Sequence, residues 1–84
     1  SAASDVYKRQ HSIVEIRVNE KLGNNTIIEL DIRAKYGINI VGIKRNEQIM
    51  VSPAANDMIL PGDILIVIGA DVDINRFVKK VIGK

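Results

Sequence analysis

Cysteine is absent from the 84 residues of this chain, so neither a disulfide framework nor a thiolate metal site is available. Aromatic residues are scarce as well. The chain has one Phe, two Tyr and no Trp, so the sequence does not predict an aromatic stacking platform for single-stranded nucleic acid. The single histidine, His11, follows the N-terminal tail, and no serine or cysteine nucleophile is paired with a base. The sequence therefore does not predict an enzyme.

Long runs of one kind of residue are missing too. Acidic and basic residues are interspersed, the net charge is only +2, and no basic stripe indicates a nucleic-acid partner. The longest apolar run, ILIVIGA at 64–70, is far too short to span a bilayer. The chain length corresponds to one small domain. A domain of this size has a small core, so association with a second copy would add stability.

The strand predictions come from apolar periodicity. Apolar and polar residues alternate along 11–20, the pattern of a half-buried strand with Val14, Ile16 and Val18 on its buried face. Segments 38–45 and 63–70 are apolar on both faces, which predicts central strands, the first with Ile38, Ile40 and Gly42 on one side and Asn39, Val41 and Ile43 on the other. A turn at 46–48 leads into a short hairpin strand that Pro53 ends, a loop follows at 54–59, and Pro61 and Gly62 suit a type II turn.

Two helices are predicted. The first spans 26–37, with a Thr26–Glu29 capping box at its start, Gly37 at its end, and apolar side chains on two adjacent faces. The second begins near Asp71, which is placed to cap it, and carries an apolar stripe of Ile74, Phe77, Val78 and Val81. The order β-α-β-β-β-α predicts a small α+β domain, with an antiparallel or mixed sheet on which the helices pack.

The aspartates offer little for a metal. Asp57 and Asp63 stand at turns, where the side chain bonds to nearby backbone, and with Asp71 and Asp73 they match no calcium-binding spacing. No glycine-rich phosphate motif is present either. The residues by themselves thus indicate a small, soluble, non-catalytic module without metal or cofactor.

Two motifs carry a resemblance. The stretch PAANDMILPGDILIVIG at 53–69 resembles the hallmark of the C-terminal subdomain of RCK modules, also called the TrkA C-terminal domain. LGNNTIIELDIRAKYGINIVGIKR at 22–45 resembles the second signature of that family. The resemblance covers 12–84 and implies a regulatory domain that pairs with a second copy, inside a cytoplasmic ring that gates a membrane K⁺ channel or transporter. Residues 1–11 are then predicted to be an interdomain linker or a cloning remnant.

The sequence is most similar to Ktr-type members of the family. Several of these bind cyclic di-AMP between two copies of this subdomain, and binding shuts down K⁺ uptake. The resemblance therefore implies a cytoplasmic homodimer with cyclic di-AMP as its ligand, no other cofactor, and attachment to the membrane through a K⁺ transporter subunit. Two alternatives stay open: a dimerisation module that binds no nucleotide, and a cation-sensing domain.

The implied ligand site lies on the first helix and the strand after it. Ile27, Ile28, Ile32 and Ile38 would form a slot for adenine, and Arg33 would bind a phosphate through its planar fork of donors. Asn39 would hold an adenine edge or the phosphate, and Asp31 and Pro53 would lie at the rim. Against this stand two ordinary roles: an ion pair between Arg33 and Glu29, and a core or dimer contact for the isoleucines.

Overall fold

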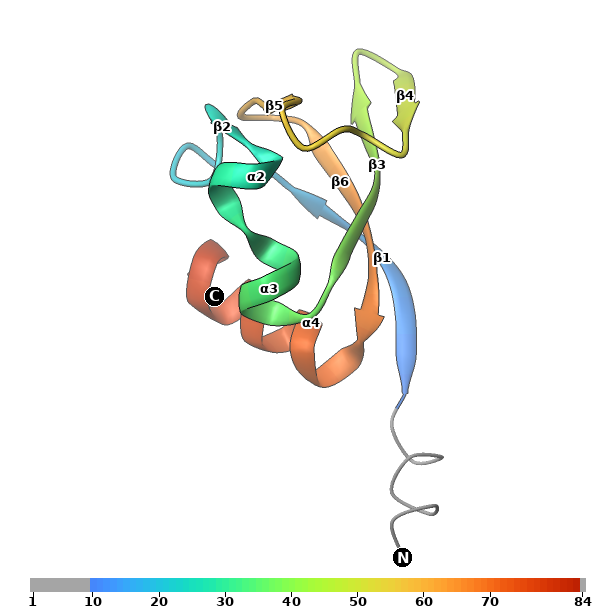
Figure 1. Ribbon diagram of the computed structural model, residues 1–84, viewed down its shortest axis with the longest axis vertical. Coiled ribbons are helices and arrows are strands. Elements are labelled where there is room, and N and C mark those ends of the chain that lie inside the picture. Colours follow the sequence, from blue (N-terminus) through green and yellow to red (C-terminus); the bar gives the residue numbers. More distant parts are fainter. Residues whose placement is uncertain (1–9, 84) are drawn as a thin grey trace, which may run out of the picture.

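The computed structural model describes residues 10–83 and consists of strands and short helices (Figure 1). Residues 1–9 of the linker predicted at 1–11 lie outside the described residues. The first strand begins at His11, the last residue of the predicted linker. The elements are β1 (His11–Arg17), β2 (Asn25–Thr26), α2 (Ile27–Leu30), α3 (Ile32–Tyr36), β3 (Asn39–Arg45), β4 (Gln48–Val51), β5 (Met58–Ile59), β6 (Ile64–Ala70), α4 (Asp71–Phe77) and the π-helical turn Val78–Ile82.

The main sheet has four antiparallel strands in the order β1-β6-β3-β4. The two segments predicted to be central, β3 and β6, are central. A second, two-stranded sheet joins β2 to β5, where Asn25 lies opposite Ile59. The sequence predicted a loop at 54–59, and it missed β5 because a two-residue strand has no periodicity of its own.

Strand β3 contains an irregularity that the sequence did not predict. Ile40 lies opposite Val67 and Gly42 lies opposite Ile66, so Val41 is an extra residue in β3. A bulge of this kind shifts the alternation of side chains by one position. Ile43 therefore packs opposite Leu65 in the core, and the prediction that it faces away from Ile38 and Ile40 is wrong.

The segment predicted as one helix is divided in two. Asp31 has left-handed backbone angles, φ 49° and ψ 39°, and separates α2 from α3. The capping box at Thr26 and the left-handed Gly37 are confirmed at the two ends. The predicted burial of two adjacent helix faces is not confirmed, because Ile32 is buried while Ile28 is 66% exposed in the single chain.

The core lies between the sheet and the helices, which Figure 1 shows on one side of the long strands. Ile74 and Phe77 are buried there, and Val78 and Val81 pack beside them, as the predicted stripe requires. Asp71 does not cap α4, because Ala70 occupies the capping position and Asp71 lies in the first turn. The α+β prediction is confirmed. Within residues 10–83, no helix combines the length and the apolar character that crossing a membrane requires.

Candidate functional site

A hollow of about 330 Å³ lies between α2, α3, the start of β3 and the loop after β4. It is lined by Ile27, Ile28, Asp31, Ile32, Arg33, Ile38, Asn39, Ile40, Pro53 and Ala55. All eight residues that the sequence nominated for a ligand site are in this set. Ile40 and Ala55 are additions. This hollow is called the α2–β3 pocket below.

The capping box fixes the helical wall of the α2–β3 pocket. The Thr26 hydroxyl accepts from the Glu29 amide at 3.2 Å, while Glu29 Oε1 accepts from the Thr26 amide at 2.7 Å and from its hydroxyl at 2.9 Å. Hydrogen bonds from the Thr26 amide, and then from its hydroxyl, lower the pKa of the Glu29 carboxyl. These contacts turn the Glu29 carboxylate back toward the start of α2.

Arg33 does not form the ion pair with Glu29 that helical spacing would allow. The ion pairs found within residues 10–83 join Lys44 to Glu15, Arg45 to Asp63 and Arg76 to Asp73. Arg33 is exposed and lines the α2–β3 pocket. Its guanidinium donors are therefore not taken up by an ion pair within the described residues and suit a group from outside the chain.

Main-chain hydrogen bonds hold the opposite wall in place. The Ile28 amide donates to the Ala55 carbonyl at 2.8 Å, and the Ile27 amide donates to the Asp57 carbonyl at 3.1 Å. The Asp57 carboxylate closes the loop by accepting from the Ala54 amide at 2.6 Å. Sequence reasoning missed Ala55 because its contribution is a backbone contact, which no side-chain pattern signals.

The α2–β3 pocket combines an apolar floor with a polar mouth. Ile32 and Ile38 are buried and belong to the core, Ile27 and Ile40 are half-buried, and Ile28 is exposed at the rim. The polar lining residues, Asp31, Arg33 and Asn39, are all exposed. This arrangement suits a ligand with a flat apolar part and an anionic group.

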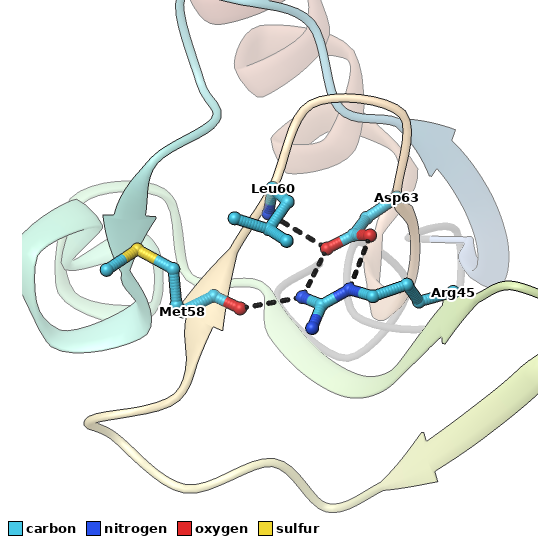
Figure 2. A network of polar contacts seen from close by, with 4 residues as sticks. All are labelled: Arg45, Met58, Leu60 and Asp63. Atoms are coloured by element: carbon cyan, nitrogen blue, oxygen red, sulfur yellow. Dashed lines mark hydrogen bonds and ion pairs between the residues drawn. The ribbon is translucent and has the colours of Figure 1, made fainter.

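A second polar cluster joins the end of β3 to the turn before β6, and it has a different character (Figure 2). Arg45 donates to both carboxylate oxygens of Asp63, from Nε to Oδ1 at 2.9 Å and from Nη2 to Oδ2 at 2.7 Å. Nη2 also donates to the Met58 carbonyl at 2.9 Å, and the Leu60 amide donates to Asp63 Oδ2 at 2.9 Å. This set is called the Arg45–Asp63 network below.

Among the described residues, Asp63 has the one charged side chain that is buried, at 3% exposure. The hydrogen bond from Arg45, and then that from the Leu60 amide, lower the pKa of the Asp63 carboxyl. The backbone bond was expected from the position of Asp63 at a turn, but Arg45 was not expected as a partner. Gly62 has φ 90°, which confirms the type II turn. The turn at 60–63 is therefore a structural element.

The other aspartates that were considered as cation ligands also have structural roles. Asp57 closes its own loop, Asp73 pairs with Arg76 at 3.3 Å, and Asp71 lies in the first turn of α4, where the helix dipole favours a negative charge. Among residues 10–83, no three His, Cys, Asp or Glu side chains gather closely enough to hold a metal ion.

Comparison with known proteins places these features in a family. The sequence profile of the TrkA-C domain matches residues 11–81. Ktr system potassium uptake protein C of Bacillus subtilis (strain 168) is 58% identical over 73 residues, which are 87% of this chain and 33% of the relative. The chain spans about a third of the length of this relative and of Ktr system potassium uptake protein A of the same organism.

Several solved structures that are more than 25% identical share the fold, among them the following two. The RCK C domain of the potassium transport protein KtrA, solved in complex with cyclic di-AMP, has a TM-score of 0.81 and 47% identity, covering 96% of this chain and 100% of that one. The RCK_C domain dimer of Streptococcus agalactiae BusR, also in complex with cyclic di-AMP, has a TM-score of 0.69 and 32% identity, covering 83% and 93%.

These matches agree with the resemblance carried by the two sequence motifs. The matched family is one of non-enzymatic regulatory domains, so the expectation that the chain is not an enzyme is confirmed by family. The profile begins at His11, where β1 begins, and ends in the π-helical turn after α4, so it covers nearly every described element. The chain belongs to the TrkA-C, or RCK C-terminal, domain family.

Proposed function

We propose that this chain is a cytoplasmic ligand-binding domain of a bacterial K⁺ uptake regulator, and that two copies bind one molecule of cyclic di-AMP between them. The observation that carries the proposal is the α2–β3 pocket, where all eight nominated residues meet. Two relatives of the same fold were solved with this ligand, which supports the choice of ligand. The 58% identity to a Ktr system protein supports the link to K⁺ uptake.

The size of the α2–β3 pocket favours a shared ligand. A volume of about 330 Å³ lies near the lower end of the range of roughly 300–1,000 Å³ that small-molecule sites occupy. A cyclic dinucleotide has two identical halves, and a two-fold interface presents the same surface twice. Each pocket would then take one half. Ile28, 66% exposed at the rim, would be covered by the ligand or by the second copy.

The charges also match. Cyclic di-AMP carries two phosphates, and two chains supply two Arg33 side chains that have no ion-pair partner within the described residues. A guanidinium can bind a phosphate through two parallel hydrogen bonds. The isoleucines would hold the adenine, and the exposed Asn39 amide, which can both donate and accept, would bind an adenine edge or the phosphate.

The proposal includes inhibition of K⁺ uptake through a membrane transporter subunit. A ligand shifts a conformational equilibrium only when it binds one state better than the other. Cyclic di-AMP would therefore have to bind more tightly to the ring state in which the transporter does not take up K⁺. The full-length protein with its transporter subunit, reconstituted in vesicles, should take up less K⁺ when cyclic di-AMP is added. Unchanged uptake with retained binding would remove inhibition from the proposal and keep the ligand.

Isothermal titration of the purified chain with cyclic di-AMP is the direct test, with cyclic di-GMP and ATP as controls and sedimentation to give the oligomeric state. We expect one ligand per two chains, and binding of cyclic di-AMP in preference to cyclic di-GMP and ATP. A flat trace on a dimeric sample would overturn the proposal and leave a dimerisation module. A Ca²⁺-dependent rise in the thermal midpoint without nucleotide binding would favour a cation sensor instead. The absence of a nucleic-acid partner and the linker at 1–11 stay predictions.

A further inference from the structure

The backbone of Asp31 stands out in the lining of the α2–β3 pocket. Its φ of 49° and ψ of 39° lie in the left-handed region, which an L-residue avoids because its Cβ then crowds a carbonyl oxygen. The Asp31 amide donates to the Ile27 carbonyl at 3.1 Å, and the Asp31 carbonyl accepts from the Lys35 amide at 3.0 Å. One residue thus closes α2 and opens α3 with a change of direction between them.

This change of direction separates side chains that an unbroken helix would keep together. In a continuous helix, residues four apart lie on the same face. Ile28 and Ile32 have that spacing, yet Ile28 is 66% exposed and Ile32 is 4% exposed.

The same spacing relates Glu29 to Arg33, and here too the two side chains are separated. The Glu29 carboxylate bonds to Thr26, and Arg33 lines the pocket without joining the ion pairs of the described residues. The break therefore coincides with the separation of both pairs.

We propose that the left-handed backbone of Asp31 is the positioning element of the α2–β3 pocket, and that its conformation rather than its charge is what ligand binding requires. The inference rests on the proposed function and adds a residue that acts through others. The break leaves Ile32 in the floor, Ile28 at the rim and Arg33 outside the ion pairs of residues 10–83. The exposed Asp31 side chain makes no capping hydrogen bond to α3, so the helix geometry does not depend on its carboxylate.

Substitutions at this position separate conformation from charge. Glycine adopts left-handed angles freely, and asparagine tolerates them about as well as aspartate, although both lack the carboxylate charge. Alanine favours the right-handed helix and would tend to join α2 and α3. A joined helix would bring Ile28 onto the face of Ile32 and Arg33 within reach of Glu29.

The test is titration of cyclic di-AMP into the parent chain and the variants Asp31→Gly, Asp31→Asn and Asp31→Ala. We expect the first two to bind within about threefold of the parent, and Asp31→Ala to bind at least about tenfold more weakly, because alanine disfavours the left-handed angles more than glycine, asparagine or aspartate does. Asn46 provides a matched control, since it has φ 51° in the β3–β4 hairpin and does not line the pocket. Asn46→Gly and Asn46→Ala should leave the affinity unchanged.

Each remaining outcome decides the inference. Parent-like binding by a folded Asp31→Ala would overturn it, as would a loss in Asp31→Gly and Asp31→Asn equal to that in Asp31→Ala, which would assign the effect to the carboxylate. If the parent binds no cyclic di-AMP, the proposed function fails on its own. The amide resonances of Ile28 and Arg33 then decide whether Asp31 sets the geometry: they should move in Asp31→Ala more than in Asp31→Gly, and equal spectra would overturn the inference.

Discussion

Arg45 and Arg33 are both arginines, but their side chains lie in opposite environments. Arg45 donates to both oxygens of Asp63 and to the Met58 carbonyl, and it joins the end of β3 to β5 and the turn before β6 (Figure 2). Arg33 lies exposed on the wall of the α2–β3 pocket and joins none of the ion pairs within residues 10–83. An arginine with its donors used inside the chain supports the fold, whereas one with free donors is suited to a ligand.

The difference comes from what each neighbouring carboxylate does. Asp63 is buried, so its charge needs a partner, and Arg45 supplies it. Glu29 has the spacing to pair with Arg33, but its carboxylate accepts hydrogen bonds from the Thr26 amide and hydroxyl in the capping box instead. The capping box and the break at Asp31 thus keep Arg33 away from Glu29, while a buried turn engages Arg45.

Removal of Arg45 should have the largest effect. Arg45→Met keeps the apolar stem but leaves the buried Asp63 carboxylate without its cation, and loss of one partner of a buried pair costs about 3–5 kcal/mol. Since Arg45 is itself 35% exposed, we expect a loss of about 3 kcal/mol, the lower end, in urea unfolding. Lys44→Met is the control, because its ion pair with Glu15 is exposed and worth about 0–1 kcal/mol. Equal losses in both variants would show that the Arg45–Asp63 network is not structural.

Acid should remove part or all of that difference. The pKa of the Asp63 carboxyl is lowered in the folded chain, first by the hydrogen bond from Arg45 and then by the Leu60 amide. A lowered folded pKa contributes stability that is present above the unfolded value, about 3.9, and is lost as the pH falls through the folded value. The gap in unfolding free energy between the parent and Arg45→Met should therefore be constant near neutral pH and narrow below about pH 4. A gap independent of pH would mean that the Asp63 charge contributes nothing.

Removal of Arg33 should have the opposite profile, with an effect on binding and little on folding. We expect Arg33→Ala to weaken cyclic di-AMP binding by roughly 1.5–3 kcal/mol, the usual contribution of hydrogen bonds to a charged group. Its unfolding free energy should stay within about 0.5 kcal/mol of the parent, as for most exposed substitutions. Arg17→Ala is the matched control for titration and urea unfolding, because Arg17 is an exposed residue of β1 that does not line the pocket. An unchanged affinity in Arg33→Ala would remove Arg33 from the site.

The capping box offers the smallest change and the finest test of the comparison. Thr26→Ala should cost about 1 kcal/mol of stability, because the Glu29 amide loses its acceptor. The hydrogen bond from the Thr26 amide to the Glu29 carboxylate survives the substitution, and the break at Asp31 still separates Glu29 from Arg33, so cyclic di-AMP binding should weaken slightly at most. Thr26→Ser keeps the hydroxyl and should behave like the parent in thermal unfolding and titration. If serine were as harmful as alanine, the methyl group rather than the cap would be responsible.

The sequence predicted best those features that depend on neighbours along the chain. The capping box at Thr26, the left-handed Gly37, the type II turn at Gly62 and the apolar stripe of α4 are set by residues within a few positions of one another. The family resemblance came from two such motifs, and the profile match over residues 11–81 confirms it. The eight nominated pocket residues came from that resemblance and do line one hollow.

Only the tertiary structure decided the features that depend on distant partners. The bulge at Val41 follows from the register of β3 against β6, and β5 exists because β2 pairs with it. The pairing of Arg45 with Asp63 joins residues that are 18 positions apart. The left-handed Asp31 interrupts a segment whose helical periodicity continues unbroken. Local propensity fixed the caps and turns because their hydrogen bonds close within one turn of chain. Register, burial and the freedom of Arg33 were settled only when strands and helices packed together.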